Sequence, residues 1–532
     1  MAAPAEKQSD FRRRFTRAKA EADRMRPLLQ REYQLLVPAH APAFDEGANP
    51  ANTAQNYDAT GSLAVSDRAG DLHDKLFPPF DEWADFSGKD APAELLQALR
   101  ETFHDAIEAS NFHSEIEQPL EECIMSVGCI ELHRGEADNP LHFEAVSAAD
   151  LVVAQGRDGR LTDTWRLRRL PLCDIADVWP EAVLPAEWER QLQDDPYAEV
   201  ALLEGEIYDA VRKQWIVEVQ PLEKDGEQPI FRAERRRRRR IAFRMAKAAK
   251  RAWGFGPGRR VFPDAHTANK TVELTLKNAS LAVSGIWQAE DDGVLNPANI
   301  KLVPGAIIPK ASGSSGLTPL APAGRFDVGQ VVLADTRGQV QRGIQGPLPP
   351  DGAKSSRRTA FEIERDERRA ARLDLPRTLH VLKELHEALV LAVLDVLADP
   401  YLIGSRFHVE DFPTGAIWPI SPLMRLRAQA KAEQAMRTYA TALSIDQETT
   451  MAVVDREAFI RWYLDYGSMP VEAVLPEGAA AQPQAPNPLE AAAGAGAEAA
   501  AKAAGTELGR QAGASLADEA GMGGIAEGFG SV

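Results

Sequence analysis

The sequence predicts a mainly helical α+β fold with one β-rich region, and three observations support this prediction. Apolar residues recur at helical spacing through much of residues 9–125 and again from residue 267 onward. Between Cys129 and Arg244 apolar and polar residues alternate, and the Asp-Gly pairs at 158–159 and 225–226 mark tight turns. Two helical stretches, 267–286 and 326–344, enclose a segment rich in Pro, Gly and Ser.

Four helices are expected before the β-rich region, at residues 9–36, 60–76, 92–109 and 114–125. Asp10 suits the N-cap of the first helix, Pro27 should kink it, and Pro38 should end it. The Pro78-Pro79 pair should end the second helix, because proline lacks the amide hydrogen that a helix interior needs. One further helix, at 184–194, is expected within the β-rich region.

The C-terminal part is expected to be helical and then to lose its regular structure. A loop rich in Gly, Pro and Ser should span 345–358, followed by a helix at 359–398 that is kinked at Pro376. Shorter helices should follow at 421–443 and 455–465. From residue 477 onward Ala, Gly, Pro and Gln dominate, so the segment 477–532 is expected to be disordered or only transiently helical.

Composition limits the classes of function. The chain has 532 residues, a net charge of −18 and 44% hydrophobic residues, which is enough for a sizeable core. Because phosphate binding needs Lys and Arg, such an acidic protein could enclose DNA more readily than grip it. Cys123, Cys129 and Cys173 are too few and too widely spaced for a disulfide framework or a zinc site. Residues 11–31 are too charged for a signal peptide, and 388–394 is too short to cross a bilayer, so we expect an intracellular protein without a membrane partner.

The sequence lacks the common catalytic motifs. It has no nucleotide-binding P-loop, no Gly-x-Ser-x-Gly elbow and no His-Glu-x-x-His helix, since His386-Glu387 lacks the second histidine. Gly254-Phe-Gly-Pro-Gly258 lacks the glycine spacing of a dinucleotide-binding loop. We therefore expect no enzyme, and in particular no nuclease or ATPase, and we expect no catalytic residue, metal ligand or cofactor.

Five short motifs follow one another in order between Tyr57 and Gly467. They are Tyr57-Asp-Ala-Thr-Gly61 with Phe77-Pro-Pro-Phe80 and Trp83, then Ser110-Asn-Phe112 leading to Gly128, then Gly254, Gly256, Pro257, Gly258 and Pro263-Asp264, then Thr359-Ala-Phe-Glu-Ile363 leading to Glu384-Leu385, and last Ile420-Ser-Pro-Leu423 with Asp455 and Tyr466-Gly467. Together they resemble the portal, or head-to-tail connector, family of short-tailed, podovirus-type bacteriophages. One small departure is Trp253-Gly-Phe255, where the family has Tyr-Gly. No single motif is specific, and the resemblance rests on their order.

The resemblance implies the phage portal fold, assembled as a ring of twelve subunits. On this chain it implies a wing at 1–262, a first stem helix at 263–286, a small α/β clip at 287–325, a second stem helix at 326–344, a tunnel loop and long wing helix at 345–420, a helical crown at 421–476 and a tail at 477–532.

The function that the resemblance implies is a channel at one capsid vertex for DNA packaging and DNA ejection. The implied partners are other copies of the chain, double-stranded DNA, the large terminase that drives packaging, tail adaptor proteins and the major capsid protein. The protein would belong to the virion, at the portal vertex, after assembly in the host cytoplasm. A different class stays open, namely a non-enzymatic virion scaffold or adaptor without a DNA channel. Such a protein would not need two stem-like helices around a Pro/Gly-rich insert.

Two groups of residues are candidates for contact with DNA. The resemblance places a channel-facing tunnel loop within 345–358, with DNA-facing residues Gly346, Gly352, Lys354, Arg357 and Arg358. The second group, the basic run, consists of Arg235, Arg236, Arg237, Arg238, Arg239 and Arg240. Six adjacent positive charges need anions close by. One interpretation is that the arginines lie on a solvated face or pair with carboxylates of the neighbouring subunit. A second is that they contact DNA phosphates. A third is that the run is a localisation signal.

Overall fold

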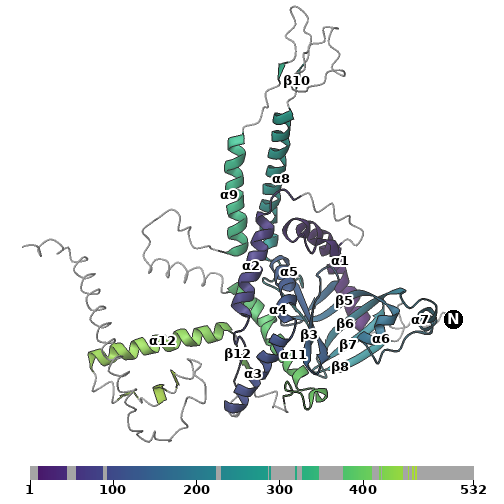
Figure 1. Ribbon diagram of the computed structural model, residues 1–532, viewed down its shortest axis with the longest axis vertical. Coiled ribbons are helices and arrows are strands. Elements are labelled where there is room, and N and C mark those ends of the chain that lie inside the picture. Colours follow the sequence, from purple (N-terminus) through teal and green to yellow (C-terminus); the bar gives the residue numbers. More distant parts are fainter. Residues whose placement is uncertain are drawn as a thin grey trace, which may run out of the picture. The chain divides into compact units, whose positions relative to one another are not determined.

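A computed structural model of the chain describes residues 10–44, 56–87, 93–222, 229–284, 287–288, 318–319, 326–346, 376–409, 418–420 and 422–446, with a few residues between 453 and 463 (Figure 1). The chain divides into two units, residues 1–441 and 442–532. The features below belong to the first unit. The predicted helix at 455–465 falls in the second unit, where only short helical pieces are described, and the predicted tail at 477–532 lies outside the described residues.

The N-terminal helices form where the sequence predicts them. They are α1 (Asp10–Leu36), α2 (Thr60–Leu76), α3 (Ala93–Ala109), α4 (Phe112–Glu115) and α5 (Glu117–Met125), with a short 3-10 turn η1 (Ala41–Phe44) after α1. The helix predicted at 114–125 is divided into α4 and α5 at Ile116. Pro27 lies inside α1, as expected from its position in the sequence.

Two antiparallel sheets form the predicted β-rich region (Figure 1). The larger has the strand order β4-β5-β6-β7-β8 and consists of β4 (Leu151–Gln155), β5 (Leu161–Pro171), β6 (Glu199–Asp209), β7 (Gln214–Pro221) and β8 (Phe231–Arg235). The smaller has the order β3-β2-β9 and consists of β3 (Asn139–Ala145), β2 (Gly128–Glu136) and β9 (Arg240–Phe243). The α+β prediction is therefore confirmed.

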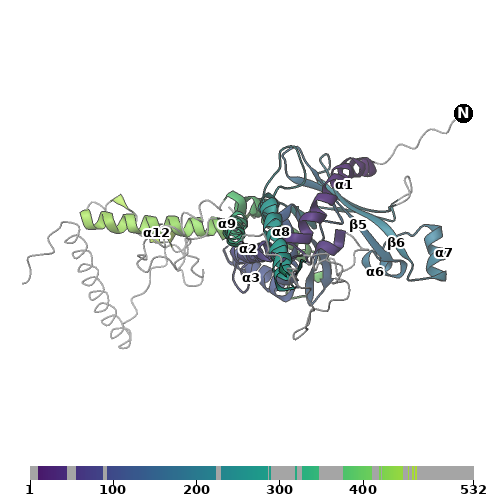
Figure 2. The same ribbon diagram turned by 90° about the horizontal axis from the view of Figure 1, so that it is seen from above.

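The long helix α1 lies beside strands β5 and β6, as Figure 2 shows from above. Phe11 and Phe15 pack on Trp165 of β5, with ring centroids 6.3 and 6.1 Å away. A Cβ atom at Gly205 of β6 would overlap the Phe11 and Trp165 rings, so this close approach needs glycine. The Nε group of Arg12 donates to Gln220 Oε1 at 2.7 Å and ties the helix to β7.

The connection between β5 and β6 carries a small core of its own. It contains the 3-10 turn η3 (Leu172–Asp174) and the helices α6 (Ile175–Val178) and α7 (Ala186–Asp194). Trp179 and Trp188 are buried in this cluster, separately from the main core. The helix predicted at 184–194 is confirmed.

Helix α8 (Pro257–Ser284) begins earlier than the predicted start at residue 267, and this corrects the sequence prediction. Pro263 lies inside the helix, where it removes one amide donor without ending the helix. Pro257 occupies the first position, which favours proline because its fixed φ suits a helix start. The wing-to-stem boundary predicted at 262 therefore falls within α8.

Helix α9 (Phe326–Gln345) lies beside α8, as Figure 1 shows. Between the two helices, β10 (Trp287–Gln288) pairs antiparallel with β11 (Thr318–Pro319). Helix α2 also packs against α9, and Arg337 of α9 forms an ion pair with Asp58 at 3.0 Å. Most of the clip predicted at 287–325 lies outside the described residues.

The predicted helix at 359–398 is described only from Pro376 onward. Residues 376–384 are helical, and α11 (His386–Leu397) continues them. Leu385 is a local irregularity with a helical backbone conformation. Its N–H donates to the carbonyl oxygen of Val381 and its carbonyl oxygen accepts from the N–H of Leu389, each at 2.8 Å, so the described part agrees with the predicted helix. His386 is fully buried there against the rings of Phe77 and Trp83.

The last described elements of the first unit are short, except for one helix. They are η6 (Pro400–Leu402), β1 (Asp85–Ser87) paired antiparallel with β12 (Trp418–Ile420), and α12 (Pro422–Ile445), close to the prediction at 421–443. Within the described ranges, no helix combines the length and apolarity that a bilayer span requires. The three cysteines are free thiols, of which Cys123 and Cys129 are buried and Cys173 is half-buried.

Glu122 of α5 should make the stability of the fold depend on pH. It is fully buried and accepts hydrogen bonds from the amide of Ala148 at 2.8 Å and from Gln118 Nε2 at 3.1 Å. Burial outweighs these bonds and raises its pKa from 4.5 to about 7. Between these pH values the folded state binds more protons than the unfolded state, so the free energy of unfolding should fall by about 3 kcal/mol as the pH rises.

Urea unfolding at pH 5 and pH 8 tests this expectation. The Glu122→Gln variant should lose most of the difference between the two pH values. The matched control Glu117→Gln changes an exposed carboxylate on the same helix and should keep it. If Glu122→Gln retains the full pH dependence of the wild type, the proton is bound elsewhere.

Candidate functional site

The basic run lies at the junction of the two sheets. Arg235 is the last residue of β8 and Arg240 is the first of β9, so the four arginines between them connect the five-stranded sheet to the three-stranded sheet. Their surroundings differ, because Arg236 is exposed whereas Arg240 is buried. The run is therefore not one uniform charged face.

Arg240 is the centre of a buried ion-pair network. Its guanidinium donates to both oxygens of Glu131 on β2, at 2.8 and 2.9 Å, and its Nη2 lies 2.5 Å from Glu204 Oε1 on β6. Glu206 accepts the main-chain N–H groups of Arg239 and Arg240, each at 3.0 Å. The carboxylates that balance Arg240 thus belong to the same chain, not to a neighbouring subunit.

Burial and charge oppose each other in this network. Burial disfavours the ionised form of Glu131, but the charges of Arg240, His133 and Arg166 outweigh it and hold the pKa of Glu131 at about 2. For Glu204 burial dominates and raises the pKa of its carboxyl group. Burial lowers the pKa of Arg240, but Glu131 and Glu204 more than offset this and raise it overall. Arg240 and Glu131 are therefore a stable charged pair.

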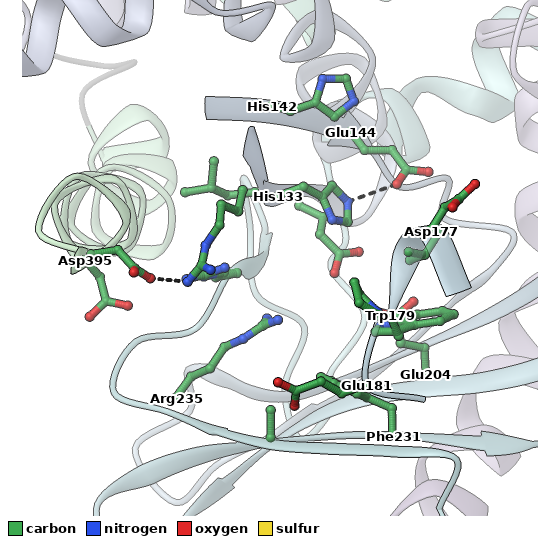
Figure 3. Close-up of a pocket in the computed structure, with 18 of the residues that line it drawn as sticks. His133, His142, Glu144, Asp177, Trp179, Glu181, Glu204, Phe231, Arg235 and Asp395 are labelled. Atoms are coloured by element: carbon green, nitrogen blue, oxygen red, sulfur yellow. Dashed lines mark hydrogen bonds and ion pairs between the residues drawn. The ribbon is translucent and has the colours of Figure 1, made fainter. Parts of the chain in front are cut away.

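A cleft of about 840 Å³, here called the acidic cleft, opens beside this network (Figure 3). Its carboxylates are Glu131, Glu144, Asp177, Glu181, Glu204, Glu234, Asp395 and Asp399, against guanidinium groups from Arg134, Arg168, Arg235, Arg236 and Arg239. Carboxylates outnumber guanidinium groups, although Arg235 points into the cleft. The acidic cleft is consequently a poor site for a phosphate group.

Three side chains in the acidic cleft have the spacing of metal ligands. Glu131, His133 and Glu144 each offer one ligand atom, all within 4.8 Å of one another. Arg240 already engages both oxygens of Glu131, however, and Arg166 Nη2 lies 2.5 Å from Glu144 Oε1. These guanidinium groups supply the positive charge that a cation would bring, so we assign the cluster to the ion-pair network.

A second buried network joins β9 to the helix at 376–384. Arg244 is fully buried and donates to Glu384 through Nη2 at 2.6 Å, through Nε at 3.2 Å and through its main-chain N–H at 3.0 Å. Its other hydrogens go to the carbonyl oxygens of Ala252 at 2.9 Å and Gly159 at 3.0 Å. Arg238 donates to the carbonyl oxygen of Glu384 at 2.8 Å. Two arginines therefore anchor Glu384 and its helix to this part of the fold.

One of the five predicted DNA-facing residues lies within the described part of the chain. Gly346 follows α9 with a φ of +91°, and its main-chain N–H donates to the carbonyl oxygen of Arg342 at 3.1 Å. This left-handed conformation is typical of the glycine that ends a helix. Gly352, Lys354, Arg357 and Arg358 lie outside the described residues.

Sequence comparison assigns a family to this architecture. Residues 8–475 match the bacteriophage head to tail connecting protein family. The chain belongs to this family. No curated protein gives a significant match to the connector.

Two solved structures are similar to this connector in part. One is the virion of a native gene transfer agent (GTA) particle, with 13% sequence identity, a TM-score of 0.33 and coverage of 78% of this chain and 94% of that chain. The other is the neck of an empty GTA particle, with 13% identity, a TM-score of 0.33 and coverage of 77% and 91%. Similarity of this degree assigns no role to individual residues.

The carboxylates of the two networks are what the sequence analysis of this connector missed. Glu204 and Glu206 could have been recognised from the sequence, because they stand two residues apart within the apolar stretch 201–207. In a strand this spacing places both side chains on one face. Two acids on one face of a buried strand need cations, and the basic run supplies them. No comparable signal marks Glu384, which stands in an ordinary helical pattern.

Proposed function

We propose that this connector is the portal subunit of a short-tailed bacteriophage. Twelve copies form a ring at one capsid vertex, and double-stranded DNA enters and leaves the head through its channel. The ring docks the large terminase during packaging, and later the tail adaptor proteins, within a shell of the major capsid protein. It assembles in the host cytoplasm and then belongs to the virion. The subunit itself catalyses no reaction.

The main support for this proposal comes from the paired helices α8 and α9. Apolar side chains remain exposed on both of them, namely Leu274 (50%) and Leu276 (52%) on α8 and Val331 (71%) and Val332 (48%) on α9. Exposed apolar side chains on two neighbouring helices can form a surface that a partner covers. A neighbouring copy can supply it, because a heterologous interface that closes on itself produces a ring.

Electron microscopy and native mass spectrometry test the ring. The wild type should form closed rings with a central hole, whereas the Leu274→Glu/Val331→Glu variant should remain monomeric with unchanged circular dichroism. The matched control Val183→Glu/Val211→Glu places the same charges at side chains that are 73% and 92% exposed elsewhere, and it should still form rings. Wild-type protein that shows only monomers and dimers at micromolar concentration contradicts the proposal. Closed oligomers without a hole would favour a scaffold or adaptor.

A lysine at Gly352 tests the predicted tunnel loop. Each added phosphate contact strengthens DNA binding and steepens its salt dependence. We therefore expect Gly352→Lys particles to package DNA several-fold more slowly at low salt and to recover at high salt, with Gly352→Gln as the uncharged control. Gly346 is unsuitable for this test because its φ of +91° would strain any side chain. Packaging at the wild-type rate at every salt concentration would show that the loop does not meet DNA.

A further inference from the structure

A second cleft, also lined by part of the basic run, gathers positive charge. We call it the basic cleft, and its volume is about 340 Å³. It is lined by Asp158, Arg160, Leu161, Thr162, Tyr208, Trp215, Arg237, Arg238, Lys383, Glu387, Ala388 and Leu391. Four cations thus face two carboxylates, the reverse of the balance in the acidic cleft. On a chain with a net charge of −18, this local excess of positive charge needs an explanation.

The cations come from three separate segments of the fold. Arg160 lies in the turn between β4 and β5, Arg237 and Arg238 lie between β8 and β9, and Lys383 lies on the helix at 376–384. The excess is therefore a product of the tertiary fold.

Arg238 is held in position by neutral hydrogen-bond acceptors. It donates to the carbonyl oxygens of Leu161 at 2.9 Å and Glu384 at 2.8 Å, and its guanidinium lies 6.0 Å from the centre of the Trp215 ring. Carbonyl oxygens satisfy the hydrogen bonds but not the charge. Among the residues that the structure describes, no carboxylate forms an ion pair with Arg237, Arg238 or Lys383.

Phosphate is the anion that this arrangement fits. Arginine presents a planar fork of donors that matches phosphate oxygens, and rigidly held guanidinium groups lose little freedom on binding. The cleft has room for a phosphate group with its sugar, and its exposed rim can follow a strand of the backbone. Contacts to phosphate position a nucleic acid without reading its sequence.

We propose that the basic cleft binds the sugar–phosphate backbone of double-stranded DNA, independently of sequence. This inference rests on the proposed portal function, which brings DNA to the subunit. It also divides the basic run. Arg237 and Arg238 face DNA together with Arg160 and Lys383, whereas Arg240 is structural.

DNA binding by the assembled full-length protein tests this site. The patch variant Arg160→Gln/Arg237→Gln/Lys383→Gln removes three cations and leaves Arg238 in place, since Arg238 holds two carbonyl groups. The control variant Arg31→Gln/Lys75→Gln/Arg190→Gln removes three exposed cations that do not line the cleft. Affinity for a short fluorescent duplex is measured by anisotropy across a range of salt concentrations. Ring formation of each protein is checked first by electron microscopy.

The patch variant should form rings and bind the duplex at least about 10-fold more weakly at low salt. Its plot of log affinity against log salt should be less steep by up to about 3, because each phosphate contact contributes about 0.9. The control variant should match the wild type.

Equal affinity and slope in the patch variant and the wild type overturn the DNA site, although rings would still support the portal function. If a polyglutamate peptide displaces the duplex and binds the protein more tightly than the duplex binds, the cleft serves an acidic protein partner instead. Absence of wild-type rings contradicts the portal function separately.

Discussion

Replacing Arg240 with Glu should prevent the β-rich region from folding. The change would bury a third carboxylate beside Glu131 and Glu204 and remove the only cation that contacts both of them in the described part of the chain. Removing one partner of a buried pair typically costs about 3–5 kcal/mol, and reversal of the charge adds repulsion. We expect the loss to exceed about 5 kcal/mol, which is comparable to the whole stability of many domains.

Chemical denaturation followed by circular dichroism measures this effect. The matched control is Arg236→Glu, which makes the same charge change at an exposed position of the same run, and it should alter the free energy of unfolding by less than about 1 kcal/mol. An Arg240→Glu protein with a cooperative transition like that of the wild type would show that the network does not support the fold.

Replacing Arg244 with Met should lower the free energy of unfolding by about 3–5 kcal/mol, because it leaves the Glu384 carboxylate buried without its guanidinium partner. The double variant Arg244→Met/Glu384→Leu should recover part of this loss, since no charge is then left unpaired. Arg212→Met breaks the exposed Arg212–Glu234 pair and serves as the control, with an expected loss below about 1 kcal/mol. A loss of the same size in Arg244→Met and Arg212→Met would contradict the importance of burial.

Local signals explain which parts of the fold could be predicted from the sequence. Helix α2 occupies residues 60–76, as predicted, because both of its ends are encoded nearby. Asp58 accepts the amide hydrogen of Thr60 at 2.9 Å, and the Pro78-Pro79 pair follows soon after the last turn. The alternating pattern likewise located the β-rich region, because it reflects which face of a sheet is buried.

The late start predicted for the first stem helix has a physical cause. Gly254 and Gly256 come so close to the carbonyl groups of Ser126 and Ile124 that a Cβ atom would overlap, and α8 begins directly after them at Pro257. The glycines and Pro257 are visible in the local sequence, but the groups that the glycines contact stand far away in the chain.

The same reasoning applies to the candidate site. The six arginines are a clear feature of the sequence, but their pattern does not distinguish buried Arg240 from exposed Arg236. That distinction comes from the pairing of β2 with β9, strands that stand far apart in the chain. The choice between carboxylate and phosphate as the partner anion was therefore open at the level of sequence, and the fold assigns different partners to different arginines.

The position of α1 has a consequence for how the subunit is made. Arg12 hydrogen-bonds to Gln220, 208 residues later in the chain, and Phe11 packs on Trp165. At about 5–20 residues per second, a ribosome needs on the order of 10–40 s to synthesise that interval. Until β4 and β5 are made, the apolar face of the first helix has no partner from its own sheet, and contacts between such distant residues also form slowly. The nascent chain thus passes through a period of exposure to aggregation before α1 is fully covered, and the last side-chain bond of this helix to its sheet has to wait for β7.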